Sequence, residues 1–350
     1  MTAFANKVTV LPMKYIILLL LFLTSCAHGP SNSNSAVLSK TSVAQIADWS
    51  RWKVSAKDGT PLEVYGVVDA VRKPVLVMLI GSRCQPLFKF KEEKVVSPLL
   101  EKDASFFRKQ GVHVLALERR GIKSFEALPE DVEKLDGRLR CSKKFGGLTK
   151  EDRINDSRDA ILALSKEPWF GDVILMGHSE GGDIASGLSN QLENLKIKAL
   201  GFFAAAGTSQ FYGHILQARK SQDLKILEET FSGLFYAAEP NASGKFGGYP
   251  VERVKSFAIS STPLDDVLKN QIPIFIATGS LDNKAPIEDA DLFAVEVIRN
   301  QPNRKILYLN YSELNHDLEN KNGNDLSKEV LTDFLTWTQK FSPERKFILK

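Results

Sequence analysis

The chain has 350 residues, of which 43% are hydrophobic and 25% charged, a composition that excludes disordered, collagen-like and coiled-coil proteins. Its 46 basic and 42 acidic residues give a formal net charge of +4. This balance is too even for nucleic acid to be the main partner. Three cysteines are too few for a disulfide-knit miniprotein, and the absence of a C-x-x-C pair argues against a structural zinc site.

An apolar run near the N-terminus indicates a targeting segment. Residues 15–23 (YIILLLLFL) follow Lys14. They are too few to cross a bilayer as a helix, which takes about 20 residues, but they suit the core of a signal peptide. The next residues, Leu23-Thr24-Ser25-Cys26, resemble the bacterial lipobox, whose cysteine is lipidated and becomes the mature N-terminus. A secretory signal that is simply cleaved nearby is the alternative, and translation can start at Met1 or Met13.

This resemblance predicts a signal peptide over residues 1–25, lipidation at Cys26 and a tether over residues 26–45. Residues 28–35 (HGPSNSNS) are small and polar, as in flexible linkers. The predicted location is the bacterial cell envelope, with a lipid anchor in the membrane. An aspartate directly after the lipidated cysteine would resemble an inner-membrane retention signal. The chain has Ala27 at that position, so the outer membrane is favoured over the inner.

Strand and helix patterns alternate along the rest of the chain. Continuous apolar runs, typical of buried parallel strands, cover residues 75–80, 112–117, 173–176, 198–206, 273–278 and 305–309. An antiparallel edge hairpin is predicted for residues 52–56 and 62–68, on either side of Asp58-Gly59. Helices are predicted after the cap Thr149 and over residues 180–193, 286–299 and 324–341. The alternation predicts an α/β fold with a doubly wound, mostly parallel sheet.

Residues 208–270 interrupt this alternation. They contain helical patterns, a glycine-rich turn at 244–248 and scattered aromatic residues, but no strong strand run. The segment is longer than a simple crossover needs. We therefore expect a helical lid at 208–270, inserted between core segments 46–207 and 271–345.

The motif that carries chemistry is Gly177-His178-Ser179-Glu180-Gly181-Gly182, which satisfies G-x-S-x-G. A predicted strand runs directly into it and a predicted helix leaves it, as in a nucleophile elbow. The chain here resembles the α/β-hydrolase family, especially its esterases and serine-peptidase-like branch, over most of residues 50–340. The resemblance implies a serine nucleophile at Ser179 and no metal or organic cofactor.

A serine hydroxyl needs an imidazole to accept its proton, and the imidazole needs a carboxylate to orient it. Only His316 follows the last predicted strand. The other four histidines are His28 in the tether, His113 at the wrong end of a strand, His178 in the elbow and pointing away from the serine, and His214 in the lid.

The family order of serine, acid and histidine requires an acid between Ser179 and His316. Asp282 lies in Gly279-Ser280-Leu281-Asp282-Asn283-Lys284-Ala285-Pro286, which resembles the G-x-x-D-x-x-x-P loop of the family. Asp289 and Asp291 are the alternatives, although both fall inside a predicted helix.

Two backbone N–H groups are needed to stabilise an oxyanion. The resemblance assigns one to Glu180, the residue after the nucleophile. The other belongs to the loop after residues 75–80, where Ser82 is the first choice and Arg83 the second. Ile80 stands where the family commonly has histidine. Arg83, Arg119 and Arg120 could line the site and favour an acidic substrate, or could be solvated surface residues, which is the commoner arrangement.

If Cys26 carries lipid, Cys84 and Cys141 remain as a pair in an oxidising compartment. Both lie in segments that leave the carboxyl edge of the predicted sheet. A disulfide between them would pin the oxyanion loop, and two buried free thiols are the alternative.

Together these features predict an envelope serine hydrolase, a carboxylesterase that acts through an acyl-enzyme on a small-molecule ester. A peptidase or amidase, an acyltransferase and a non-catalytic binding protein of the same fold are the alternatives. The last is disfavoured because all three triad residues are present. The sequence predicts no oligomeric state.

Overall fold

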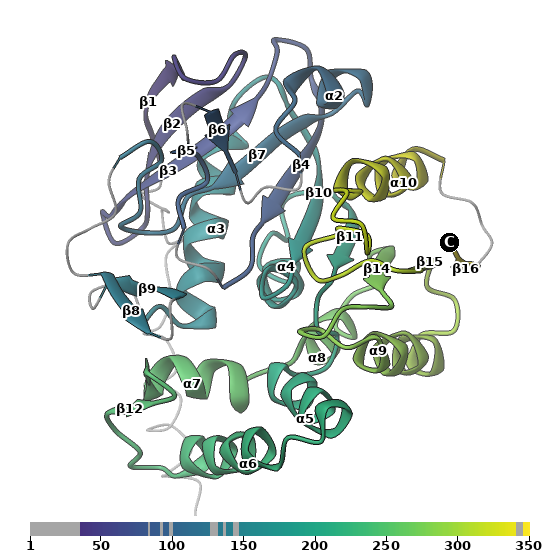
Figure 1. The fold of residues 1–350 in the computed structure, drawn as a ribbon. Coiled ribbons are helices and arrows are strands. Elements are labelled where there is room, and N and C mark those ends of the chain that lie inside the picture. The colour runs from purple at the N-terminus through teal and green to yellow at the C-terminus, as the bar shows by residue number, and fades with distance from the viewer. Residues whose placement is uncertain are drawn as a thin grey trace, which may run out of the picture. The chain divides into compact units, whose positions relative to one another are not determined.

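Ten strands of the computed structural model form one sheet, in the order β1-β2-β3-β7-β4-β10-β11-β14-β15-β16 (Figure 1). The structure describes residues 36–82, 85–91, 94–97, 101–126, 132–135, 138–142, 147–340 and 346–350. The strands of the sheet are β1 (Ala36–Ser42), β2 (Ser50–Ser55), β3 (Pro61–Val67), β4 (Lys73–Leu79), β7 (His113–Leu117), β10 (Phe170–His178), β11 (Ile197–Phe203), β14 (Ile274–Gly279), β15 (Ile306–Tyr311) and β16 (Lys346–Leu349).

Helices and three small hairpins complete the described elements. The helices are α2 (Ala104–Lys109), α3 (Lys150–Leu164), α4 (Gly181–Leu188), α5 (Gln210–Ser221), α6 (Leu224–Ala238), α7 (Val251–Ala258), α8 (Pro263–Val267), α9 (Ile287–Asn300) and α10 (Ser327–Lys340). The hairpins pair β5 (Lys89–Lys91) with β6 (Lys94–Val96), β8 (Val132–Leu135) with β9 (Arg138–Ser142), and β12 (Lys245–Phe246) with β13 (Tyr249–Pro250).

The sheet is parallel from β7 to β16 and antiparallel from β1 to β7. The predicted doubly wound, mostly parallel α/β sheet is therefore confirmed. Because parallel strands point the same way, their carboxyl ends meet along one edge, and the loops that leave them lie close together there.

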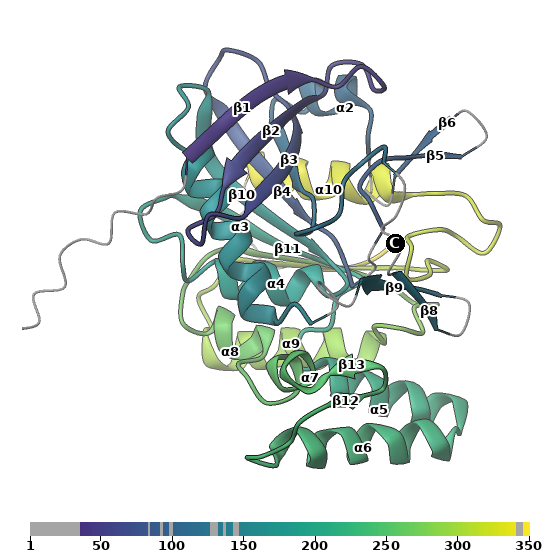
Figure 2. The ribbon, with the colours of Figure 1, turned by 90° about the vertical axis from the view of Figure 1, so that its left-hand side faces the viewer.

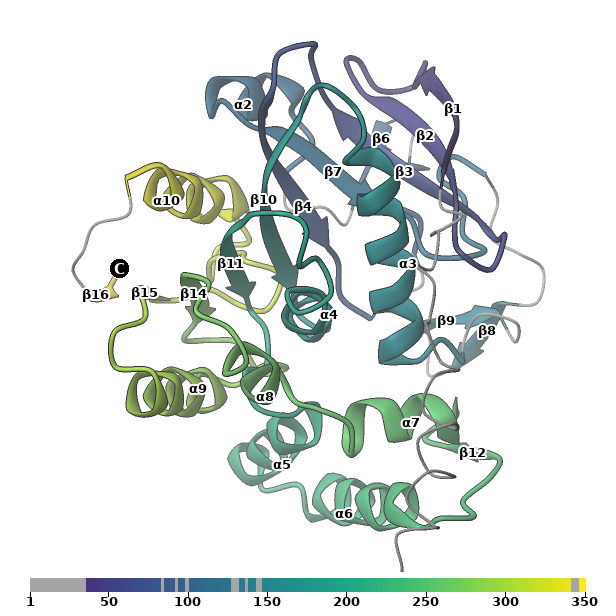
Figure 3. The same ribbon diagram turned by 180° about the vertical axis from the view of Figure 1, so that it is seen from behind.

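Helices cover both faces of the sheet. On one side the buried apolar cluster includes Phe107 of α2 and Phe334 of α10. On the other it includes Ile161 of α3, Ile184 of α4 and Phe293 of α9. Figures 1 and 3 show α10 and α9 on opposite sides of β14. This double cover explains why the central strands read as continuous apolar runs.

Both edge strands were missed at the sequence level. Residues 36–42, which we assigned to the tether, form β1 and pair antiparallel with β2. The side chains of β1 are almost all exposed, so no apolar pattern marked it. At the other edge, β16 begins after residue 345, where we ended the core, and it pairs parallel with β15.

Residues 208–270, which are called the lid segment from here on, contain α5 to α8. Figure 2 shows α5 and α6 side by side, with α7 next to them. The short helix α8 instead packs against α4 and α9 of the core layer. No helix within the described ranges is long and apolar enough to cross a membrane.

Candidate active site

Ser179 lies in the tight turn between β10 and α4. Its φ is 56°, in the left-handed region that residues with a side chain rarely adopt. Its N–H donates to the carbonyl of Phe203 at 3.0 Å, and its own carbonyl accepts from the N–H of Gly182 at 2.8 Å. These bonds hold the strained turn that the G-x-S-x-G pattern predicted.

The glycines of the motif allow the backbones to approach one another. A Cβ on Gly177 would lie 2.2 Å from the carbonyl oxygen of Gly181. A Cβ on Gly181 would lie 1.9 Å from the carbonyl oxygen of Leu79, at the end of β4. Both positions therefore exclude any larger residue, and the start of α4 is held directly against β4.

The structure brings Ser179, His316 and Asp282 together in one chain of hydrogen bonds. Nε2 of His316 lies 3.0 Å from Oγ of Ser179. Nδ1 of His316 lies 2.9 Å from Oδ2 and 3.1 Å from Oδ1 of Asp282. The three residues follow β10, β15 and β14, so the parallel sheet alone brings them to one edge. His316 and Asp282 are buried, at 7% and 3% exposure.

The loop after β14 holds the carboxylate of Asp282 in place. Its Oδ1 also accepts the backbone N–H groups of Lys284 and Ala285, each at 2.8 Å. The two alternative acids form hydrogen bonds with residues outside this chain of three. Asp289 accepts bonds from the backbone and hydroxyl of Thr208, and Asp291 accepts from the hydroxyl of Tyr308 at 2.7 Å.

At the sequence level His178 is predicted to point away from the serine site, and this prediction is wrong, because the side chain contacts His316. Its Nε2 lies 2.9 Å from the backbone carbonyl of His316, and the two rings are 5.2 Å apart. Since a carbonyl only accepts, Nε2 of His178 carries a proton and donates it. Burial, helped by the neighbouring His316, lowers the pKa of His178 to about 4, so its ring is neutral at pH 7.

The loop after β4 passes close to the serine. A Cβ on Gly81 would lie 2.9 Å from Cβ of Ser179, so this loop is well placed to supply an oxyanion donor. The carbonyl of Ser82 accepts from Nη1 of Arg119 at 2.9 Å. Arg83, the second candidate donor, lies outside the described residues.

Arg119 is not a solvated surface residue. It is 8% exposed and lies with Arg153 and Arg253 around the buried carboxylate of Glu180. Burial alone raises the pKa of Glu180, but Arg253, Arg153 and Arg119 together lower it to about 2. We had assigned Glu180 only a backbone role, because nothing in GHSEGG shows which cations surround its side chain.

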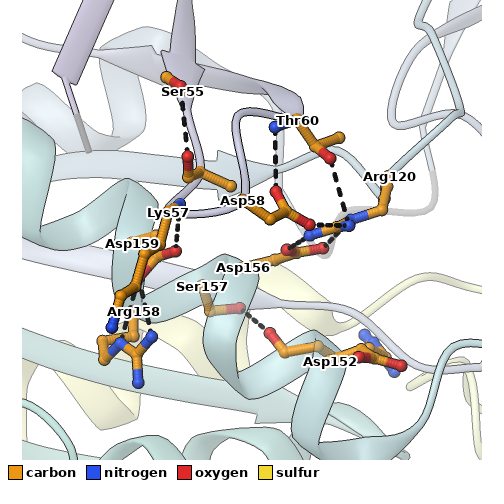
Figure 4. A network of polar contacts seen from close by, with 12 residues as sticks. Ser55, Lys57, Asp58, Thr60, Arg120, Asp152, Asp156, Ser157, Arg158 and Asp159 are labelled. Carbon is orange, nitrogen blue, oxygen red and sulfur yellow. Dashed lines mark hydrogen bonds and ion pairs between the residues drawn. The ribbon is translucent and has the colours of Figure 1, made fainter. Parts of the chain in front are cut away.

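Arg120 serves the scaffold instead. Figure 4 shows its guanidinium between Asp58, in the turn from β2 to β3, and Asp156 of α3. It also donates to Oγ1 of Thr60 at 3.3 Å. These bonds connect the edge hairpin to α3. Arg120, one of the candidates for binding an acidic substrate, is therefore already paired with two carboxylates of the protein.

The remaining predicted residues are not described. Cys26 and Cys84 lie outside the described residues, and so does the side chain of Cys141 in β9. Lipidation and the disulfide therefore stay predictions. Among the residues that the structure does describe, no group of three or more histidine, cysteine, aspartate or glutamate side chains could hold a metal ion.

Comparison with known proteins identifies the fold. No family model and no curated protein sequence matches the chain. Among solved structures, a puromycin-hydrolysing peptidase of Mycobacterium tuberculosis is similar at 14% identity and a TM-score of 0.53. That match covers 87% of this chain but only 42% of the peptidase chain.

Two smaller proteins match over most of both chains. The α/β hydrolase GrgF of a Penicillium species has 17% identity and a TM-score of 0.53, over 83% of this chain and 98% of that one. An esterase of Pyrococcus furiosus has 14% identity and a TM-score of 0.51, over 82% and 90%. At such identities the likeness establishes the fold. The chain has the α/β-hydrolase fold.

Proposed function

We propose that the protein is a serine hydrolase that uses Ser179, His316 and Asp282 as a catalytic triad. The observation that carries the proposal is the continuous hydrogen-bond chain of these residues, at 3.0 Å and 2.9 Å. Asp282 accepts the Nδ1 proton of His316, which leaves the lone pair of Nε2 directed at the serine hydroxyl. A merely structural role would not require a strained serine backbone at the centre of this chain.

The geometry supports acyl transfer in two halves. Oγ of Ser179 attacks the substrate carbonyl while Nε2 of His316 takes the hydroxyl proton, and the tetrahedral oxyanion is stabilised by the N–H groups of Glu180 and Ser82. The C–O bond to the leaving group then breaks, and His316 donates its proton to the departing alcohol. Water attacks the acyl-enzyme with His316 as base, which releases the acid and regenerates Ser179.

We propose a carboxylesterase as the specific activity, with a small-molecule ester as substrate. The similar fold of the Pyrococcus furiosus esterase supports an ester. The name of the Mycobacterium tuberculosis protein, a puromycin-hydrolysing peptidase, makes an amide the alternative to test. The triad needs no cofactor for either reaction.

A fluorophosphonate probe tests the assignment, because it phosphonylates only an activated serine. Wild-type protein should be labelled, Ser179→Ala should not, and Ser312→Ala, which changes an exposed serine after β15, should be labelled like wild type. Labelling that survives in Ser179→Ala would contradict the assignment. Nitrophenyl esters of increasing chain length and aminoacyl anilides then separate esterase from amidase, and an added alcohol acceptor reveals acyl transfer.

We further propose that Cys26 is lipidated and anchors the protein in the bacterial envelope, with the outer membrane favoured. The support is the sequence alone: an apolar run that ends in Leu23-Thr24-Ser25-Cys26. In a bacterial host the protein should take up labelled fatty acid and fractionate with the membrane. Cys26→Ser should abolish both, while Cys141→Ser should change neither. A soluble, unlabelled wild-type protein would contradict the anchor but not the hydrolase.

A disulfide between Cys84 and Cys141 remains our proposal for the other two cysteines. It would restrain the loop that also contains Ser82. Non-reducing peptide mapping of oxidatively expressed protein should recover the two cysteines in one linked peptide. Recovery of both as free thiols would exclude it.

A further inference from the structure

Glu180 contributes to the candidate site through its backbone, yet its side chain is also unusually placed. The residue directly follows the nucleophile and is 5% exposed. A buried carboxylate is expensive unless cations and hydrogen bonds compensate it. It would also repel an oxyanion that forms at the N–H of the same residue.

Three arginines from three separate elements compensate this carboxylate. Nη1 of Arg153, in α3, donates to Oε1 of Glu180. Nη2 of Arg253, in α7, donates to Oε2 at 2.5 Å. Nη2 of Arg119, just after β7, lies 3.9 Å from Oε1. Three guanidinium groups thus face one carboxylate, and this charged cluster (Glu180, Arg119, Arg153 and Arg253) presents net positive charge next to the oxyanion position.

The same arginines also hold the loop after β4. Nη2 of Arg153 donates to the carbonyl of Ile80 at 2.8 Å. Arg119 donates to the carbonyl of Gly81 and, at 2.9 Å, to that of Ser82. Three consecutive loop carbonyls therefore bind guanidinium groups of the charged cluster.

These bonds determine where the candidate oxyanion donor points. In a trans peptide the carbonyl of one residue and the N–H of the next point in opposite directions. When Arg119 binds the carbonyl of Gly81, it therefore directs the N–H of Ser82 away from the charged cluster. A donor fixed before the reaction starts has no reorganisation to undergo, which is the basis of oxyanion stabilisation.

Arg253 extends the charged cluster into the lid segment. Besides Glu180, it donates to the carbonyl of Leu148 at 2.6 Å. Its guanidinium lies over the ring of Phe257 at 4.8 Å and that of Tyr249 at 5.3 Å. One side chain thus joins α7, the segment before α3 and the residue after the nucleophile.

We propose that the charged cluster is the positioning unit of the oxyanion hole: Arg119 and Arg153 orient the loop after β4, Glu180 holds them, and Arg253 ties the lid segment to them. The proposal rests on the serine-hydrolase function proposed above. Glu180 and the arginines act through the donors and do not themselves touch the substrate.

The proposal predicts losses that appear in kcat, because the oxyanion exists only after attack. Removal of one oxyanion donor typically costs about 10² to 10³ in kcat. We expect Arg119→Met to lower kcat for a nitrophenyl ester about 100-fold with KM within about threefold. Affinity for a trifluoromethyl ketone, which forms a tetrahedral adduct on the serine, should fall with kcat. Affinity for the corresponding ether, an uncharged analogue of the ester that has no carbonyl group, should stay unchanged.

Conservative and distal variants separate positioning from general damage. Arg119→Lys keeps a cation but cannot span two carbonyls, so its kcat should lie between wild type and Arg119→Met. Arg253→Met and Glu180→Gln should each lower kcat at least tenfold. The double variant should lose much less than the product of the two, because both break the same ion pair. Arg299→Met, which removes an exposed arginine of α9, is the matched control and should leave kcat unchanged.

Thermal melts identify variants that do not fold, and the decision then rests on the folded members of the Arg119→Lys and Arg253→Met pair. Wild-type kcat and ketone affinity in the folded variants would overturn the positioning role, and so would equal losses of affinity for the ketone and the ether. Neither result would touch the proposed function, which fails only if wild-type protein is not labelled by the fluorophosphonate or if Ser179→Ala still is.

Discussion

The triad and the charged cluster meet at two neighbouring residues, Ser179 and Glu180, yet the fold builds them in different ways. Each triad residue lies in a loop directly after a parallel strand, so the register of the sheet brings the three together. The charged cluster instead draws arginines from the end of a strand, from a core helix and from the lid segment. Its members meet only because the buried ions pair with one another.

The difference has an energetic side. The triad contains one carboxylate that is satisfied by its own loop and by one imidazole. In the charged cluster every ion depends on partners far away in the sequence. Removal of one partner of a buried pair leaves an uncompensated charge. Substitutions in the triad should therefore affect rate more than stability, whereas those in the charged cluster should affect both.

The triad variants should give the largest effects. We expect His316→Ala to lower kcat by about 10⁶ and Asp282→Asn by about 10⁴, without a large change in the melting temperature. Because the residues act as a unit, Ser179→Ala combined with His316→Ala should lose no more than either alone. Steady-state kinetics with calorimetry measures both. A loss in His316→Ala of less than 100-fold would contradict the assigned base.

Asp183 sharpens the comparison. It lies one helical turn from Glu180, but its pKa is shifted in the opposite direction. It accepts a bond from the neutral amide of Gln210 at 3.1 Å. Burial raises the pKa of Asp183 to about 7, whereas arginines lower that of Glu180 to about 2. The same depth in the protein thus gives opposite shifts, depending on whether a guanidinium is in contact.

The raised pKa of Asp183 predicts that the effect of Asp183→Asn on stability depends on pH. Between the ordinary value of 3.8 and about 7, the folded state binds more protons at this site than the unfolded state does. The contribution of Asp183 to stability therefore decreases as pH rises through this range. Asp183→Asn removes the titration, so its free energy of unfolding relative to wild type should rise by up to about 4 kcal/mol from pH 4 to pH 8.

Urea denaturation of both proteins at several pH values measures this difference. Ser312→Ala, which changes an exposed residue and removes no ionisable group, is the control and should show a flat difference. A flat difference for Asp183→Asn as well would contradict the raised pKa.

A glycine of the elbow tests the close approach on which the triad depends. A Cβ on Gly181 would meet the carbonyl oxygen of Leu79 at 1.9 Å, whereas one on Gly213 in α5 has no neighbour closer than 3.9 Å. We expect Gly181→Ala to destabilise the protein by about 3 kcal/mol and to slow fluorophosphonate labelling. Gly213→Ala should be neutral or slightly stabilising, because alanine favours a helix. Equal stability of the two variants would contradict the packing of α4 against β4.

The same contrast explains how far the sequence could predict the site. Ser179 and Asp282 lie in short motifs that start where apolar strand runs end, and His316 is the one histidine after the last such run. Those signals are local. Arg153 and Arg253 carry no local signal, because arginines in amphipathic helices are usually solvated. Their role depends on their contacts with the buried carboxylate of Glu180, and only the folded structure shows these contacts.

The fold was predictable for a related reason. The central strands are buried on both faces and read as apolar runs, whereas β1 is exposed and β16 lies beyond the last predicted helix. Their pairing comes from free backbone at the sheet edges and not from side-chain pattern. The strands β1 and β16 were missed for this reason, whereas the parallel strands of the core were predicted.

His178 should give the smallest effect, because it touches the triad only through a backbone carbonyl. Its Nε2 proton is donated to the carbonyl of His316 at 2.9 Å, and a single such bond contributes about 1 kcal/mol. His178→Phe keeps a ring but leaves that carbonyl without its donor, so His316 should sample other positions. We expect kcat to fall about tenfold with KM unchanged, while His178→Gln, which can still donate, should recover most of the loss. Nitrophenyl ester kinetics at pH 7 to 8, where His178 is neutral, measures the difference. If His178→Phe and His178→Gln had equal kcat, the bond to His316 would have no part in holding the triad.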